Sequence, residues 1–464
     1  MVNCMKSVAF HNLGCKVNAY EIEVMQQMLQ EKGYQVVPFD TKADIYIINT
    51  CTVTNIADRK SRQMLHRVKK LNPDSIVVAV GCYVQTDSET VEKDLAVDIA
   101  VGNNRKTQLP EILEEYLQRH ELSGGIESTE PEGHQADMNI LDINHTDVYE
   151  DMQLTQTAEH TRAYIKVQDG CNQFCTYCII PFARGRVRSR SVENICKEVG
   201  TLAEKGYREI VVTGIHLSSY GLDFDGVSYE FAAKEWNTSH LLELLQAIHA
   251  IPGVERIRLG SLEPRIITEE FADALVSMEK ICPHFHLSLQ SGCDSVLQRM
   301  NRHYSAGEYL EKVELLRRKF EHPAITTDVI VGFPGETAEE FEITRNFLEQ
   351  ICLFEMHIFK YSRRKGTKAA DMPGQLTEHE KAVRSEVLLE METRQSKNFR
   401  SFYLGKEVEV LLEEEKEIDG QRYQIGHTKE YVKVAVPADG IARSNQIWRG
   451  VPEGFLTNEI LIAH

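Results

Sequence analysis

Short apolar segments alternate with segments of helical periodicity over the first 118 residues. The apolar runs cover residues 7–11, 45–49 and 76–81, and the helix-like stretches cover 18–32, 57–70 and 106–118. In the first of these stretches, Ile22, Met25 and Leu29 recur at helical spacing. Such alternation is typical of a parallel sheet with helices on its faces. We therefore expect residues 1–118 to form an N-terminal α/β domain.

The next segment, residues 119–157, shows neither a strand-like nor a helical pattern of apolar residues. It is acidic and contains Gly, Pro and Glu, a composition typical of linkers and loops. We expect an acidic linker or an exposed flap here.

A second and longer alternation occupies residues 158–398. Six strand-like runs cover 162–168, 209–214, 256–261, 284–290, 326–332 and 354–359, and helix-like stretches such as 192–205, 239–251 and 305–320 follow them. Six βα units predict a full or partial (β/α) barrel, whose chemistry lies at the carboxyl ends of the strands.

The chain changes character again after a long helix-like stretch, residues 378–400. The runs GKEVEVLLEE, QRYQIGHT and YVKVAV are short and strand-like, and Gly and Pro punctuate the end. We expect residues 399–464 to form a small all-β domain.

The net charge of −18 over 464 residues at first argues against a polyanionic partner. Ten of the acidic residues lie within 120–161, where there is no Lys or Arg, so the average says little about any one surface. The chain has no run of about 18 apolar residues, as a membrane span requires. The first residues also lack the apolar core of a secretory signal. We expect a cytoplasmic protein that does not associate with membranes.

The cysteines are more informative than the charge. Cys171, Cys175 and Cys178 form a CxxxCxxC motif directly after the first barrel strand. Three thiolates on one loop can hold a 4Fe–4S cluster and leave one iron without a protein ligand. Zinc usually takes four ligands from paired CxxC spacings, and the chain has no second close pair. Three packed or free thiols are the remaining alternative.

Three further cysteines follow strand-like runs of the N-terminal domain. Cys15, Cys51 and Cys82 each lie just beyond the carboxyl end of a predicted strand, where an open parallel sheet gathers its functional loops. A second metal cluster and three buried thiols are both compatible with this pattern. Five cysteines show no such placement and are expected to be packing or incidental thiols: Cys4, Cys196, Cys282, Cys293 and Cys352.

The CxxxCxxC loop resembles the signature of the radical S-adenosylmethionine (SAM) enzymes. Together with GCxxN, NTC and GC at the three N-terminal cysteines, it resembles the radical SAM methylthiotransferases over essentially the whole chain. This resemblance implies an auxiliary 4Fe–4S cluster on Cys15, Cys51 and Cys82. It also implies a SAM-binding 4Fe–4S cluster on Cys171, Cys175 and Cys178, with Tyr177 near the adenine of SAM. It further implies a C-terminal domain of the RNA-binding TRAM type.

Within this family, the stretches LGCKVNAYE, TCTVTNIADRKSR and TTDVIVGFPGET resemble the tRNA threonylcarbamoyladenosine methylthiotransferases. The resemblance implies methylthiolation at carbon-2 of the modified adenosine at position 37, beside the tRNA anticodon. It implies two uses of SAM, one for methyl transfer to sulfur and one for a radical that abstracts hydrogen from carbon-2. The partners would be the tRNA anticodon loop, a low-potential electron donor and a sulfur donor. The alternatives are isopentenyladenosine tRNA or a ribosomal-protein aspartate as substrate, and a non-enzymatic metal-binding RNA adaptor.

Other residues at predicted strand ends fit a SAM pocket by position. They are Gly214, Glu263, Gln290 and Asp328, the last within a stretch that resembles a segment beside the adenine in this superfamily. Ordinary turns at a barrel mouth would explain the same residues.

Basic clusters are the candidate RNA contacts. Arg184, Arg186, Arg188 and Arg190 follow the cysteine loop, six basic residues lie between 59 and 70, and a third group contains Lys360, Arg363, Arg364, Lys365 and Lys368, with Tyr361 as a base-stacking platform. A solvated charged face would explain any one of these clusters, but three on an acidic protein favour RNA.

Overall fold

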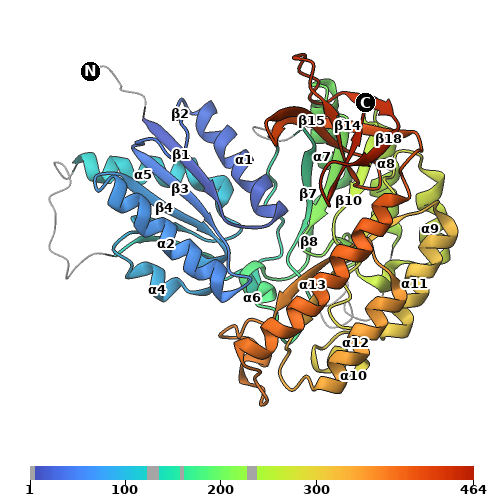
Figure 1. Cartoon of the computed structure of the whole chain (residues 1–464). Helices are drawn as coiled ribbons and strands as arrows, with labels where there is room; N and C mark the ends of the chain where they lie inside the picture. Colours follow the sequence, from blue (N-terminus) through green and yellow to red (C-terminus); the bar gives the residue numbers. More distant parts are fainter. Residues whose placement is uncertain (1–5, 123–134, 157–160, 227–237) are drawn as a thin grey trace.

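The computed structural model describes residues 6–122, 135–156, 161–226 and 238–464 (Figure 1). An N-terminal parallel sheet, a central barrel-like array and a C-terminal sheet follow one another along the chain. This is the expected α/β fold with an all-β end.

The N-terminal sheet has six parallel strands in the order β2-β1-β3-β4-β5-β6. Both central strands, β3 (Ile45–Thr50) and β4 (Ile76–Gly81), are almost completely buried. Burial on both faces explains why their sequences are continuous apolar runs instead of alternating ones. The other strands are β1 (Ser7–Asn12), β2 (Gln35–Val36), β5 (Ile99–Val101) and β6 (Asp137–Asn139), and the helices are α1 (Lys16–Glu31), α2 (Asn55–Leu71), α3 (Cys82–Thr86), α4 (Ser88–Glu92) and α5 (Leu109–Leu122).

The segment expected to be an acidic linker is in part a structured element. Strand β6 lies within it and pairs in parallel with β5. Its acids also have internal partners, because Glu150 accepts a hydrogen bond from the Thr107 amide at 2.7 Å and Asp151 pairs with Arg190 at 2.6 Å. The prediction was wrong for this part, since these contacts are long-range and leave no local period. Residues 123–134 and 157–160 lie outside the described residues.

The central array contains the six predicted parallel strands, now bounded as β7 (Ala163–Asp169), β9 (Glu209–Gly214), β10 (Arg256–Leu259), β11 (His284–His286), β12 (Ala324–Val331) and β13 (Glu355–Lys360). They form two sheets, β10-β9-β7-β8 and β11-β12-β13, with β8 (Arg188–Ser189) antiparallel to β7. Isolated bridges between Ile257 and Ile281 and between Leu262 and Leu287 join the two sheets. The result is a partial barrel, as expected.

Helices cover the outer face of this barrel (Figure 1). Three of them begin with a capping box, in which a Ser or Thr side chain and a Glu three residues later satisfy the first backbone amides; the pairs are Ser305 and Glu308, Thr337 and Glu340, and Thr377 and Glu380. The helices are α6 (Ile180–Arg184), α7 (Val192–Glu204), α8 (Ser239–His249), α9 (Glu269–Ser277), α10 (Asp294–Arg299), α11 (Ala306–Lys319), α12 (Ala338–Ile351) and α13 (Glu378–Ser401).

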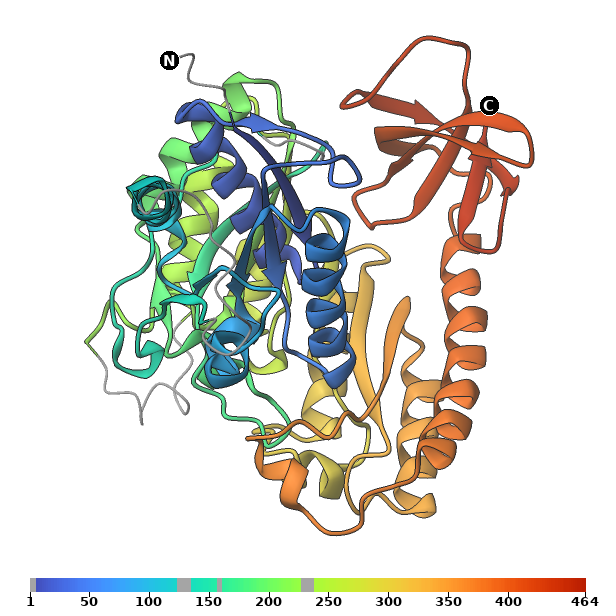
Figure 2. The same ribbon diagram turned by 90° about the vertical axis from the view of Figure 1, so that its left-hand side faces the viewer.

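Helix α13 leads from the barrel to the C-terminal sheet (Figure 2). That sheet has the order β17-β14-β15-β16-β19-β18 and is antiparallel except between β16 and β19. Its strands are β14 (Val408–Ile418), β15 (Gln421–His427), β16 (Lys433–Pro437), β17 (Ile447–Gly450), β18 (Pro452–Phe455) and β19 (Ile460–Ala463). The predicted small all-β unit is therefore present.

A loop of the C-terminal sheet docks on the barrel strands. Arg256 donates to the backbone carbonyl of His427 at 2.9 Å, and Arg258 donates to that of Lys429 at 2.9 Å. The ring of Tyr431 stacks on His284 with centroids 4.9 Å apart. Backbone carbonyls therefore take part in joining the sheet to the barrel, beside side-chain ion pairs such as that of Arg256 with Glu409. No helix in the described residues is long and apolar enough to cross a membrane.

A buried ion network joins the N-terminal domain to the barrel. Glu21 on α1 is completely buried and pairs with Lys106 of its own domain at 2.5 Å. It also pairs with two barrel residues, Lys166 at 2.8 Å and Arg184 at 2.6 Å. Burial alone would raise the pKa of Glu21, but these three cations hold the pKa well below its ordinary value. The carboxylate stays ionised and links the two domains.

We expect Glu21→Gln to destabilise the protein by roughly 3–5 kcal/mol, because it removes the anion that three buried cations share and leaves Asp169 alone to balance Lys166 and Arg184. Denaturant unfolding of the full chain would measure the loss. Glu31→Gln, at an exposed position of the same helix, is the matched control and should change stability little. Equal stabilities for the two variants would contradict a structural role for this network.

Candidate functional site

The CxxxCxxC loop is held in one conformation by its backbone. It leaves β7 through Gly170, whose φ of +73° places it in the left-handed region. A Cβ at this position would lie 1.8 Å from the carbonyl oxygen of Arg186, so no side chain fits. Cys171 donates its amide to Gly185 at 3.0 Å, and Cys178 donates to Cys175 at 3.0 Å. The three thiols are therefore presented from one short, rigid turn.

The surroundings of this loop favour a cluster over free thiols. Burial raises the pKa of Cys171, and it raises that of Cys178 to about 12. Arg302 donates to the sulfur of Cys175 at 3.2 Å. Cys171 and Cys178 would stay protonated at neutral pH unless a metal drives their ionisation, and Arg302 can balance part of the resulting negative charge.

The three N-terminal cysteines lie at one edge of the parallel sheet. Cys15 follows β1 and caps α1, Cys51 follows β3, and Cys82 is the first residue of α3, after β4. Strands β1, β3 and β4 are direct neighbours. The amino ends of α1 and α3 carry partial positive charge, which favours thiolates.

Glycines and asparagines fix this edge. A Cβ on Gly14 would lie 2.3 Å from the side chain of Asn18, and one on Gly81 would lie 2.6 Å from that of Asn49. Asn18 donates to the side chain of Asn49 at 3.1 Å and to the carbonyl of Thr50 at 3.1 Å. The GCxxN and NTC motifs are thus two sides of one hydrogen-bonded unit.

One arginine connects the two cysteine sites. Arg184, six residues after Cys178, donates through Nε to the sulfur of Cys82 at 3.3 Å and through Nη2 to Asn18 at 2.9 Å. Asn103 supports the same junction, since its amide donates to Ala183 at 2.7 Å and approaches the sulfur of Cys82 at 3.5 Å. Both sets of cysteines therefore face one junction between the domains.

Comparison with known proteins agrees with this arrangement. Residues 7–102 match the model of the uncharacterized protein family UPF0004, and residues 165–348 match the radical SAM superfamily. The chain is 39% identical to the threonylcarbamoyladenosine tRNA methylthiotransferase MtaB of Bacillus subtilis, over 93% of this chain and 90% of that protein. The chain belongs to the radical SAM methylthiotransferase family.

Two further similarities extend this comparison. A tRNA-2-methylthio-N(6)-dimethylallyladenosine synthase of Moorella thermoacetica is 34% identical, over 95% of this chain and 94% of that protein. Among solved structures, the radical SAM methyltransferase TsrM of Kitasatospora setae has a TM-score of 0.55 at 17% identity, covering 77% of this chain and 75% of that one. At this identity the likeness concerns the fold alone.

The cysteines not assigned to a cluster lie elsewhere in this methylthiotransferase. Cys282 is buried at the start of the segment leading to β11, and Cys293 packs in a small apolar cluster with Phe333. Cys352 is exposed after α12, and Cys196 is half-buried on α7. Cys4 lies outside the described residues.

The residues expected around SAM lie near the barrel mouth. Tyr177 packs edge-on against Phe333, with ring centroids 6.5 Å apart. Gly214 ends β9, and a Cβ there would lie 2.9 Å from Gln168. Glu263 is buried and pairs with Arg265 at 2.5 Å, and Gln290 is buried with φ of 71°.

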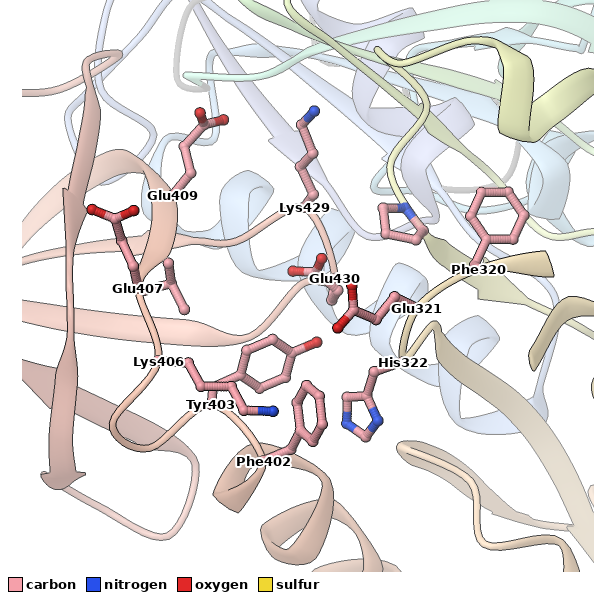
Figure 3. Close-up of a pocket in the computed structure, with 12 residues that line it drawn as sticks. Phe320, Glu321, His322, Phe402, Tyr403, Lys406, Glu407, Glu409, Lys429 and Glu430 are labelled. Carbon is pink, nitrogen blue, oxygen red and sulfur yellow. The ribbon is translucent and has the colours of Figure 1, made fainter. Parts of the chain in front are cut away.

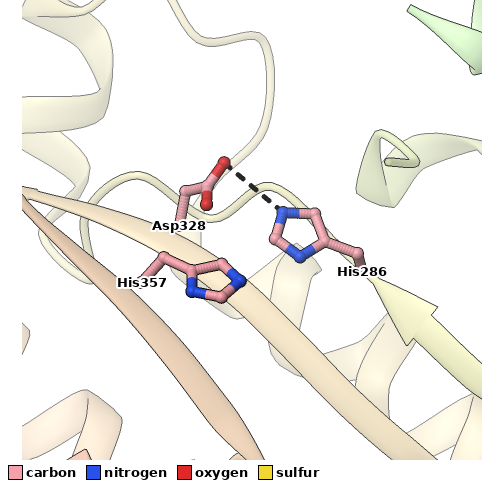
Figure 4. A group of neighbouring side chains, drawn as sticks. All are labelled: His286, Asp328 and His357. Carbon is pink, nitrogen blue, oxygen red and sulfur yellow. Dashed lines mark ion pairs between the residues drawn. The ribbon is translucent and has the colours of Figure 1, made fainter. Parts of the chain in front are cut away.

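Asp328, expected in the same group, has a different setting. It lies within β12, and its carboxylate forms an ion pair with His286 at 3.4 Å. His357 of the neighbouring strand β13 completes a compact group with these two side chains (Figure 4).

The structure corrects the prediction for four of the arginines expected to bind RNA. Arg184, Arg188 and Arg190 are at most 1% exposed. Arg190 pairs with Glu198, and Arg188 donates to the backbone carbonyls of Arg184 and Arg186. Arg364 is also buried and pairs with Asp58 across the domain boundary. Internal acids and carbonyls occupy their donors, so these guanidinium groups hold the protein together instead of facing a phosphate.

Two of the predicted arginines and many of the lysines remain accessible. Arg186 is half-buried over the ring of Phe174, at 4.5 Å, and Arg363 is exposed. Asn55, at the start of α2, donates to the backbone carbonyl of Arg363 at 2.6 Å. The predicted basic helix and the basic stretch 360–368 therefore adjoin. Tyr361, expected as a stacking platform, is instead buried against Phe333.

A separate pocket of about 460 Å³ lies where the barrel meets the C-terminal sheet (Figure 3). Its wall includes His322, Phe402, Tyr403 and Lys406, and His322 stacks on Phe402 with centroids 3.7 Å apart. None of the six cluster cysteines lines it. This pocket therefore belongs to the contact between the barrel and the C-terminal sheet and not to the cysteine sites.

Sequence reasoning missed several residues of the site. Arg302, Asn103 and Glu21 all contact the cysteine sites or Arg184, yet the sequence assigned none of them a role. Glu21 does end the stretch LGCKVNAYE, but nothing in that stretch reveals its role, and Arg302 and Asn103 lie in none of the quoted motifs. The three come from segments far apart in the chain, and only the fold brings them together.

We expect Gly170→Ala to disrupt the CxxxCxxC loop, because its Cβ would overlap the carbonyl of Arg186. After anaerobic reconstitution, iron should fall from roughly eight to roughly four atoms per chain. Gly200→Ala is the matched control: it lies in α7 with nothing within 4 Å of its new Cβ and should keep its iron. Full iron in both variants would show that the loop tolerates the change.

Proposed function

We propose that this chain methylthiolates carbon-2 of N6-threonylcarbamoyladenosine at position 37 of tRNA. The observation that carries the proposal is the contact of Arg184, just beyond the CxxxCxxC loop, with the sulfur of Cys82. It brings both cysteine sites to one junction, where a single base could reach both. The names of the relatives that share 39–40% identity with this chain support the threonylcarbamoyl substrate.

Two 4Fe–4S clusters and SAM are the proposed cofactors. Cys15, Cys51 and Cys82 would hold the auxiliary cluster, and Cys171, Cys175 and Cys178 would hold the other. Burial raises the pKa of the Cys51 and Cys178 thiols, so a bound metal would have to drive their ionisation. Helix amino ends and the nearby Arg302 would then favour the resulting thiolates. When bound, the second cluster supplies the electron that cleaves SAM to methionine and a 5′-deoxyadenosyl radical. Carbon-2 of adenine has neither an acidic proton nor a leaving group, so radical chemistry suits it.

The protein's own residues would bind and orient. We propose SAM contacts from Tyr177, Gly214, Glu263 and Gln290. The buried carboxylate oxygen Oε2 of Glu263 has no hydrogen-bond partner among the described residues, so it can accept one from a ligand; its ion pair with His216 spans 3.7 Å.

The basic surface would bind RNA. Of the arginines expected to bind RNA, we propose that Arg186 and Arg363 do so, together with exposed basic residues of α2 and of 360–368. Phosphate contacts would hold the anticodon loop while the unpaired base is turned out of its stack. We also propose a low-potential electron donor and a sulfur donor as partners, and a cytoplasmic location, which suits a tRNA substrate.

The substrate is tested by mass spectrometry of tRNA nucleosides from a deletion strain. We expect 2-methylthio-threonylcarbamoyladenosine to disappear and threonylcarbamoyladenosine to accumulate. If the 2-methylthio derivative of isopentenyladenosine disappears instead, isopentenyladenosine tRNA is the substrate. Complementation with the intact gene is the control, and persistence of the first nucleoside would reject the proposal.

The two cysteine sets should separate the two parts of the reaction. Cys175→Ala should abolish release of 5′-deoxyadenosine, because SAM would lose its cluster. Cys82→Ala should keep that release yet form no methylthiolated nucleoside. Both are measured by liquid chromatography of anaerobic reactions. Cys196→Ala, on a half-buried thiol outside both sites, should be near neutral; if it behaves like Cys175→Ala, the assignment of the cysteines is wrong.

A further inference from the structure

Three side chains with metal-binding atoms meet on the inner face of the barrel. His286, Asp328 and His357 come from β11, β12 and β13, three strands that are hydrogen-bonded neighbours (Figure 4). None of them belongs to either cysteine site.

The strand register places these side chains on one face. On β12, Ile325, Val329 and Val331 pack in the core shared with the outer helices, so Thr326 and Asp328 point to the inside of the barrel. Asp328 is directly opposite His357 on β13. His286 is opposite Thr326, two residues before Asp328 on the same face.

Their distances suit a shared ion. One potential ligand atom from each residue lies within 4.8 Å of the other two. Nε2 of His286 is 3.4 Å from Oδ2 of Asp328, and the two imidazole rings stack at 5.7 Å with an angle of 26°. Two histidines and one carboxylate form a common ligand set for divalent first-row metals.

A second contact orients the first histidine. Nδ1 of His286 lies 3.0 Å from the hydroxyl of Thr326. Histidines that bind a metal commonly engage their other ring nitrogen in this way, which fixes the ring and directs the free nitrogen at the ion.

The carboxylate of Asp328 has no Arg or Lys partner among the described residues, unlike several other acids of the protein. Glu21, Glu209 and Glu336 each pair with Arg or Lys. Among the described residues, Asp328 forms an ion pair with His286 alone. Its side chain is 31% exposed and that of His286 is 14% exposed, so an ion can reach both.

We propose that His286, Asp328 and His357 bind one divalent transition-metal ion of the zinc class. The ligands are one ring nitrogen from each histidine and a carboxylate oxygen. Three protein ligands leave at least one open position, which would take an oxygen or nitrogen donor of a molecule inside the barrel. This site goes beyond the proposed function and does not depend on the two cysteine sets.

The test uses full-length protein with its iron–sulfur clusters reconstituted anaerobically, washed briefly with chelator and titrated with Zn²⁺ by calorimetry. Occupied cysteines keep zinc off the thiolates. We expect one Zn²⁺ per chain, binding at least tenfold weaker to Asp328→Asn and lost in His357→Ala. X-ray absorption at the zinc edge should show nitrogen and oxygen ligands with imidazole scattering.

His379→Ala, an exposed histidine on α13, is the matched control and should bind like the wild type. Iron content and circular dichroism of each variant verify its fold, and the isosteric Asp328→Asn serves where His357→Ala is unstable. Three results would overturn the proposal: no zinc bound by the wild type, equal binding by the wild type and both site variants, or sulfur in the zinc shell. Absence of zinc binding by the wild type would mean that His286, Asp328 and His357 contact only the substrate. None of these results bears on the nucleoside analysis, so the two proposals fail independently.

Discussion

The buried carboxylate of Glu21 is the interaction on which the arrangement of this protein depends. Its partners are one cation from its own domain, Lys106, and two from the barrel, Lys166 and Arg184. Ions buried without partners cost several kcal/mol each, so this network is favourable only when the two domains are docked in one way. The same arginine touches Cys82. The constraint that joins the domains therefore also sets the relation between the two cysteine sites.

Such an arrangement suits chemistry that needs two metal centres at one base. Each cysteine set is presented from the carboxyl ends of parallel strands, one in the N-terminal sheet and one in the barrel. Loops at strand ends vary without disturbing the sheet below them, which is why function gathers there. In this chain, the two sheets turn such edges toward a common junction.

The order of the elements and the cysteine motifs were predictable from the sequence, because both are local. Continuous apolar runs predicted β3 and β4, shorter strand-like runs predicted the barrel strands, and CxxxCxxC predicted the loop after β7. Strand β6 was missed because it has three residues and no period. The fate of the arginines was also hidden. Arg184 lies in a basic stretch like those that bind RNA, and its partner Glu21 is 163 residues away in the chain. Burial of a charge depends on its partner, and sequence spacing does not reveal such pairs.

The contact between Asn55 and Arg363 has a consequence for the unfinished chain. The two basic segments that adjoin there lie about 308 residues apart. During synthesis, the N-terminal domain emerges long before residue 363, so it displays only half of the basic surface. An incomplete chain would then hold tRNA weakly, because affinity for nucleic acid grows with the number of phosphate contacts. On the basic surface proposed to bind tRNA, substrate capture would therefore require the complete chain.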